Sequence, residues 1–142
     1  MRVQKMWFVL ALLAAVFAAL TSILAKVGIE DVDSSLGTAI RTVVVFAMAC
    51  GMVWLSGARV QLAEISARSW IFLVLSGLAT GASWLCYFKA LQLGDVSKVA
   101  PVDKTSIVFT IIMAVLFLRE PLTLKVAIGG ACIVAGTLIL AL

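Results

Sequence analysis

The sequence contains no histidine and only three cysteines, and charged residues make up 13% of its 142 positions. Cys50, Cys86 and Cys132 each lie inside an apolar run and form no CxxC pair, so the sequence offers almost no ligands for a zinc or iron site. It also lacks a phosphate-binding glycine loop and any nucleophile paired with a base. These absences predict a protein that is not an enzyme and that uses no metal or other cofactor.

The scarcity of charge is matched by an excess of apolar residues. Hydrophobic residues account for 64% of the chain, and the mean hydropathy is +1.22. Soluble domains carry about a quarter charged residues, so a soluble fold of this composition would expose much apolar surface to water. The net charge of +4 comes from basic residues scattered singly at the ends of apolar runs. That pattern is typical of membrane topology control and predicts a lipid bilayer, not a nucleic acid, as the partner.

Several apolar segments are long enough to cross a hydrocarbon core, which takes about 20 helical residues. Backbone polar groups cannot stay unpaired in lipid, so these segments should be helices. The predicted fold is all-α, a polytopic membrane bundle of five helices in one domain of residues 3–141. The predicted spans are 5–27, 35–56, 69–92, 98–118 and 121–141.

Three local features accompany these spans. The uncharged run from Met6 to Ala25 exceeds the roughly 7–15 residues of a signal-peptide core, so we expect an uncleaved first span. Residues 60–68 are predicted to form a short surface helix. Pro121 is expected in the first turn of the fifth helix, where a missing N–H costs nothing.

Five spans place the two termini on opposite membrane faces, and basic residues are retained on the cytoplasmic side. Six basic residues fall on the N-terminal face, namely Arg2, Lys5, Arg59, Arg68, Arg119 and Lys125. At span ends the other face carries Lys26, Lys89 and Lys98. The count predicts an N-terminus inside and a C-terminus outside. We expect the membrane to be the bacterial cytoplasmic (inner) membrane. The margin is modest, which leaves dual insertion open.

Most of the polarity within the membrane is predicted to lie near one face. The ends of spans one and three and the starts of spans two and four must share that face, whatever the orientation. Two polar stripes recur there at helical spacing, one from Ser76 to Tyr87 and one from Asp103 to Thr110. They predict a shared cavity; the alternative is hydrogen bonding that only holds the helices together. The candidate substrate-binding residues are Arg41, Trp84, Tyr87, Asp103, Lys104 and Ser106.

In this hypothesis Arg41 or Lys104 holds an anionic group, and Asp103 titrates or holds an amine. Trp84 and Tyr87 cover the substrate. Each role has a simpler alternative. Asp103 could pair with a neighbouring cation, Arg41 could extend to the interface, and the two aromatic residues could belong to an interfacial belt.

The order of residues in the last three spans resembles the C-terminal part of an EamA domain, from the drug/metabolite transporter superfamily. The matching elements are the Ala90–Gly94 turn, Pro101-Val102, Glu120 after an apolar run, and the glycines at 129 and 136. The first two spans, with Lys26 and Arg41, resemble short single-domain members. The chain departs from the family in reading Ser106-Ile107-Val108 where a second proline is common, and in having one such domain where typical members have two.

The resemblance implies half of a ten-helix transporter built from two inverted repeats. It therefore implies a homodimer, antiparallel or parallel, or a heterodimer with a sibling half-transporter. The implied function is a secondary transporter that exports small metabolites or drugs. The alternatives are a small flippase subunit for a lipid-linked sugar and a non-transporting membrane accessory or scaffold subunit. A four-span multidrug pump is disfavoured, because the first span contains no acidic residue.

Overall fold

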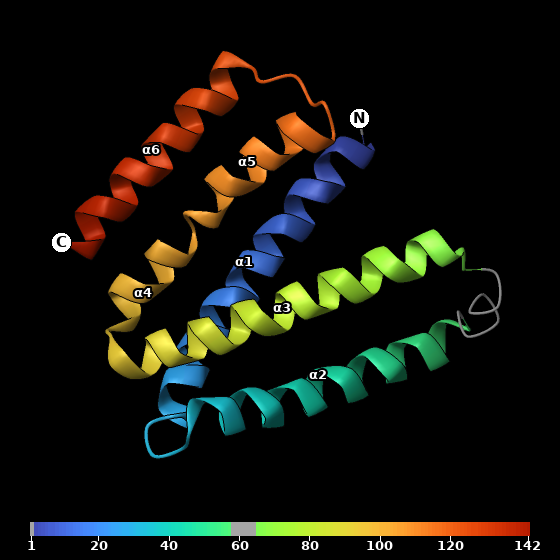
Figure 1. Ribbon diagram of the computed structural model, residues 1–142, viewed down its shortest axis with the longest axis vertical. Helices are drawn as coiled ribbons and strands as arrows, with labels where there is room; N and C mark the ends of the chain where they lie inside the picture. Colours follow the sequence, from blue (N-terminus) through green and yellow to red (C-terminus); the bar gives the residue numbers. More distant parts are fainter. Residues whose placement is uncertain (1, 58–64) are drawn as a thin grey trace. The chain divides into compact units, whose positions relative to one another are not determined.

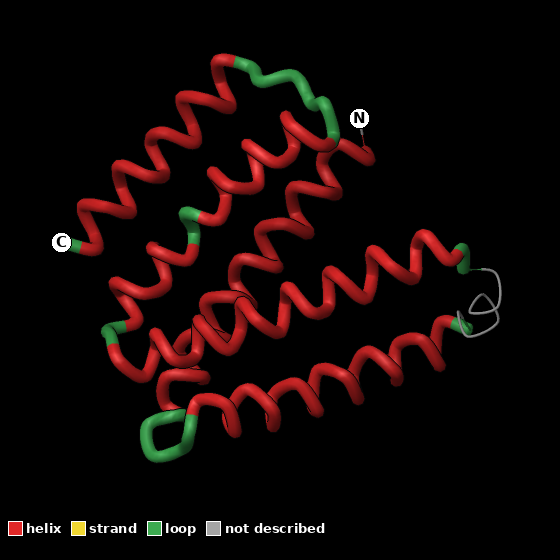
Figure 2. Tube along the Cα trace, in the orientation of Figure 1, coloured by secondary structure: helices red, strands yellow, loops and turns green. Residues whose placement is uncertain are grey.

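The computed structural model describes residues 2–57 and 65–142, with side chains from Met6 onward, and this part of the chain is helical without strands (Figures 1 and 2). The helices are α1 (Arg2–Gly28), α2 (Ser34–Ser56), α3 (Ala67–Leu93), α4 (Val96–Asp103), α5 (Ser106–Phe117) and α6 (Leu124–Ala141). The prediction of an all-α fold is confirmed.

The described helices supply five stretches long and apolar enough to span a membrane, with α4 and α5 together forming the stretch Val96–Phe117. No more than 11% of the most apolar window of any stretch is buried inside the protein. Large apolar side chains therefore point outward along every span, which suits lipid as the surrounding solvent. The number of spans agrees with the sequence-based expectation.

The fifth span starts later than the sequence predicts. The helix α6 begins at Leu124, and the Thr123 hydroxyl accepts a hydrogen bond from the Val126 N–H at 3.3 Å. A threonine in this capping position satisfies one of the free N–H groups of a first turn. Pro121 thus lies before the helix, and its predicted place in the first turn is wrong. Of the surface helix predicted over 60–68, residues 60–64 lie outside the described part, and α3 begins at Ala67.

The fourth span is present but is not the single helix that the sequence predicts over 98–118. It breaks at Lys104 and Thr105, where the backbone hydrogen bonds change from four-residue to three-residue spacing. The Lys104 N–H bonds to the Pro101 carbonyl at 2.9 Å, and the Thr105 N–H bonds to the Val102 carbonyl at 3.0 Å. The Thr105 hydroxyl adds a second bond to the Val102 carbonyl at 2.7 Å. Pro101 lies inside α4, three residues before the break, and its missing N–H leaves the Ser97 carbonyl without its usual helical partner.

The chain divides into two compact units, one comprising residues up to Ile23 with Leu93–Leu142, the other Leu24–Gln92. In the first unit α4 and α5 follow one another along α6 and both pack against it (Figure 1). Close approach there depends on Gly130, since a Cβ at this position would lie 3.3 Å from the Ile111 Cδ1. The single domain over residues 3–141 stays a prediction.

The second unit is held together where the turn between α1 and α2 meets the end of α3. Ile29, Phe88 and Leu91 are buried. The Lys26 ammonium donates to the Leu91 carbonyl at 2.6 Å, and the Gln92 amide donates to the Val32 carbonyl at 2.7 Å. These bonds satisfy carbonyls that the helix end and the turn leave without backbone partners.

The start of α2 is capped by Asp33, whose carboxylate accepts hydrogen bonds from the N–H groups of Ser35 at 2.8 Å and Leu36 at 3.3 Å. These two backbone bonds lower the pKa of the Asp33 carboxyl below its ordinary value of 3.8, and the positive charge of Lys89 contributes a smaller lowering. The cap is therefore strongest when the carboxyl is ionised.

Replacing Gly37 with alanine should destabilise the second unit. A Cβ at Gly37 would lie 2.8 Å from the Ile29 Cγ2, a branched methyl in the core that cannot swing away. Overpacking of this kind outweighs the gain in helix propensity, so we expect a net loss of about 0.5–2 kcal/mol, read as a lower melting temperature in detergent. Gly77→Ala is the matched control, because nothing lies within 4 Å of a Cβ there. Equal melting temperatures for the two variants would contradict this account of the packing.

The Asp33 cap should make stability depend on pH. Because its folded-state pKa is lowered, the cap contributes stability above the unfolded-state pKa and loses it as the pH falls through the folded-state value. Asparagine caps helices without titrating. We expect Asp33→Asn to lose less melting temperature than wild type between about pH 6 and pH 3. Asp31→Asn, which removes the same charge from the same turn, should behave as wild type.

Candidate functional site

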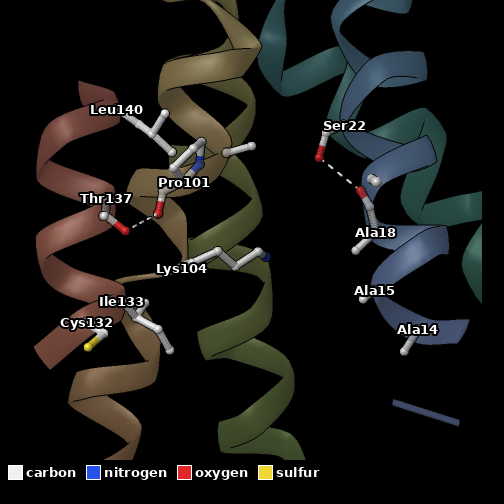
Figure 3. A pocket seen from close by; sticks show the side chains of 13 residues that line it. Ala14, Ala15, Ala18, Ser22, Pro101, Lys104, Cys132, Ile133, Thr137 and Leu140 are labelled. Atoms are coloured by element: carbon white, nitrogen blue, oxygen red, sulfur yellow. Dashed lines mark hydrogen bonds between the residues drawn. The ribbon is translucent and has the colours of Figure 1, made fainter. Parts of the chain in front are cut away.

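A cavity of about 650 Å³ opens in the first unit among α1, α4 and α6 (Figure 3). Small residues of α1 form one wall. The end of α4 next to the break and the C-terminal half of α6 form the others. The lining residues are Ala14, Ala15, Ala18, Ala19, Ser22, Ala100, Pro101, Lys104, Cys132, Ile133, Gly136, Thr137 and Leu140.

The walls are apolar apart from two hydroxyls and one ammonium. The Ser22 hydroxyl donates to the Ala18 carbonyl at 2.9 Å, and the Thr137 hydroxyl donates to the Pro101 carbonyl at 3.3 Å (Figure 3). Both hydroxyls thus donate hydrogen bonds to backbone carbonyls of the protein itself. Lys104 is the charged residue of the lining.

Lys104 stands at the helix break, and its side chain extends from α4 toward the space beside α1 (Figure 3). Its ammonium lies 3.1 Å from a carboxylate oxygen of Asp103, and the two side chains are 55% and 37% exposed. An ion pair this exposed contributes little stability, so the ammonium can exchange its partner for another anion. An apolar cavity with one cation at its edge suits an amphiphile that carries a negative charge.

A second polar arrangement lies in the other unit, on facing parts of α2 and α3. The guanidinium carbon of Arg41 lies 4.5 Å from the centre of the Trp84 ring and 5.3 Å from that of Phe88. Tyr87, on the same stretch of α3, is near enough to interact electrostatically with the guanidinium. Three of the predicted site residues therefore meet here.

The other three predicted residues surround the helix break. Asp103 ends α4, Lys104 follows it, and Ser106 begins α5. Of the simpler alternatives, the pairing of Asp103 with Lys104 is observed. That the two sets of residues form one shared cavity stays a prediction.

Two hydroxyls of the polar stripes bond within their own helices. The Thr80 hydroxyl donates to the Ser76 carbonyl, and the Thr110 hydroxyl donates to the Ser106 carbonyl, both at 2.9 Å. These bonds lie within single helices, so they neither join helices nor commit the residues to a ligand. Among the described residues, no group of three cysteine, aspartate or glutamate side chains lies close enough to hold a metal ion.

The site residues predicted from the sequence include neither Phe88 nor any residue of the α1 and α6 walls of the cavity. Phe88 could have been found, because it follows Trp84 by four residues and so shares its helix face. Thr137 gave no such signal. Its role depends on a carbonyl distant in sequence, that of Pro101, which only the packing of α4 on α6 brings near.

The model of the EamA-like transporter family matches residues 5–142, nearly the full chain. The chain belongs to the EamA-like transporter family.

A relative from Sinorhizobium sp, described as an uncharacterized transporter in the cobO 3' region, is 51% identical over 138 residues. The match covers 97% of this chain and 98% of the relative. No solved structure matches the chain significantly. The family and the five apolar helices together identify an integral membrane transporter, and they point away from an enzyme.

The hydrogen bond from the Thr137 hydroxyl to the Pro101 carbonyl should stabilise the first unit measurably. Thr137→Val keeps the shape of the side chain and removes the donor to the Pro101 carbonyl. We expect a loss of about 0.5–1 kcal/mol, seen as a lower melting temperature in detergent. Thr110→Val is the control, since its hydroxyl bonds only within its own helix. A larger effect at Thr110 would contradict the role given to Thr137.

Proposed function

We propose that this chain is a half-size secondary transporter that exports small amphiphilic organic anions, metabolites or drugs, across the bacterial inner membrane. The observation that carries the proposal is the cavity among α1, α4 and α6, where apolar walls meet the ammonium of Lys104. The body of an amphiphile would lie against the alanines of α1, and its anionic group would replace Asp103 as the partner of Lys104. Outward direction is an expectation from the family resemblance.

The helix break supports the same site. Secondary transporters often bind substrates where a membrane helix is discontinuous, because a break frees backbone groups and allows two helix halves to move separately. Here the break lies between α4 and α5, and Lys104 is part of it. Asp103 would take up a proton or a cationic group when Lys104 turns to the substrate. Ser106 would contribute a hydroxyl at the first turn of α5.

The roles proposed for Arg41, Trp84 and Tyr87 in holding a substrate concern the second unit, where these three residues lie near one another. Five spans make half of the inverted-repeat architecture, so the assembly is a homodimer, antiparallel or parallel, or a heterodimer with a sibling half-transporter. In the proposal the N-terminus lies inside and the C-terminus outside, as the bias of basic residues favours.

The proposal predicts that Lys104 controls transport of anionic amphiphiles. In proteoliposomes, Lys104→Gln should reduce the flux of an aryl carboxylate at subsaturating concentration by about tenfold or more, because a charge-assisted hydrogen bond is lost. Lys98→Gln, which removes the same charge from the same helix but lies outside the cavity, should keep wild-type flux. Flux measured in both directions decides whether the carrier favours export.

Three results would contradict the proposal. Equal flux for Lys104→Gln and wild type would exclude Lys104 from the site. Complete absence of flux, with protein that is folded and inserted, would favour an accessory or scaffold subunit. Movement of a lipid-linked sugar between leaflets, without flux of soluble anions, would favour the flippase alternative.

A further inference from the structure

Arg41 lies well inside a membrane span. It is the eighth residue of α2, so at 1.5 Å per residue it lies about 10 Å along the helix from Ser34. The rings that hold its guanidinium belong to Trp84 and Phe88, which precede the end of α3 at Leu93 by about 13 and 7 Å. The guanidinium is thus held at the depth of the rings and does not extend to the helix ends.

The contacts of Arg41 with the two rings are made without a hydrogen bond from its guanidinium to either ring residue. Aromatic rings attract the planar face of an arginine, whereas its five N–H donors point outward in the plane. Within residues 2–57 and 65–142, no carboxylate pairs with Arg41 and no oxygen accepts a hydrogen bond from it. The side chain is only half-buried, so this edge can be reached.

A cation in this position calls for an acceptor of opposite charge. Charges within membrane spans normally face a protein interior or watery cavity and are paired. The nearest acidic residue along the chain, Asp33, is already engaged as the cap of α2. The planar fork of an arginine matches an oxyanion that accepts two parallel hydrogen bonds.

We propose that Arg41, held by Trp84 and Phe88, forms a binding site for a single oxyanion, a carboxylate or a phosphate. The site lies in the second unit and is argued from contacts within that unit alone. It does not depend on the cavity beside Lys104, and it requires no transport. The anion can come from a soluble organic molecule or from a lipid headgroup.

The experiment uses the full chain in a maltoside detergent, which contains no phosphate or carboxylate. The soluble probes are benzoate and phenyl phosphate, with benzylammonium as the cationic counterpart. We expect the two anions to raise the melting temperature and benzylammonium not to raise it, because a ligand stabilises the folded state to which it binds. Separate samples receive phosphatidylglycerol in place of the probes to test the lipid source.

Variants assign the effect to Arg41. Arg41→Lys keeps the charge but loses the planar fork, and should raise the dissociation constant of the anion by about tenfold or more. Arg41→Gln should abolish binding. The matched control is Arg68→Gln, because the Arg68 guanidinium also lies over a ring, that of Phe72 at 5.8 Å, but in the first turn of α3. It should bind the anions as wild type does.

Stabilisation by benzoate or phenyl phosphate that depends on Arg41 supports a soluble ligand. Stabilisation by phosphatidylglycerol alone, with the same dependence, supports a lipid headgroup as the source of the oxyanion. The proposal is overturned if Arg41→Lys binds anions as wild type, if benzylammonium stabilises equally, or if neither anion nor lipid stabilises wild type. If the protein transports anions but shows no anion binding that depends on Arg41, only the Arg41 site is refuted. If it binds anions at Arg41 but transports none, only the carrier function is refuted.

Discussion

In a lipid environment every backbone N–H and carbonyl needs a partner from the protein, and the rest of this structure depends on that requirement. It turns the apolar segments into helices, and it demands a substitute wherever a helix is interrupted. At the interruption in the fourth span, three-residue backbone bonds replace the usual ones. The Thr105 hydroxyl bonds to the Val102 carbonyl, and Thr137 reaches across from α6 to the Pro101 carbonyl. The break is therefore a supported feature of the fold.

The need to pair every backbone polar group also explains what most polar side chains of the second unit bind. Lys26 and Gln92 bond to carbonyls that a helix end and a turn expose, and Asp33 bonds to the N–H groups that begin α2. Arg41 is the exception, because aromatic faces hold it and no described oxygen does. Polar groups that complete the backbone are structural. A polar side chain that is held in place with its hydrogen-bond donors available is a better candidate for ligand binding.

Membership of the EamA-like family and the geometry of the first unit point to the same kind of protein. A carrier needs a site that is polar enough to select a solute and loosely enough paired to release it. The exposed Asp103–Lys104 pair beside an apolar cavity meets both conditions, because its two charges hold each other only weakly. A continuous fourth helix would not offer the same arrangement. The short helix α4 brings Pro101 and Lys104 to the wall that α1 and α6 complete.

The amino-acid sequence by itself determined that the chain is helical, that it crosses a membrane five times, and which family it resembles. These properties follow from run length, hydropathy and local residue order, none of which requires distant contacts. It also singled out Arg41, Trp84 and Lys104, because charged and aromatic residues are conspicuous within apolar runs. Only the tertiary structure decided that the fourth span breaks and that the last helix begins at Leu124, capped by Thr123, instead of at Pro121. It also decided that Phe88 and the α1 and α6 walls belong to the sites. Those outcomes depend on helix packing and on single hydrogen bonds, and a pattern of apolar residues specifies neither.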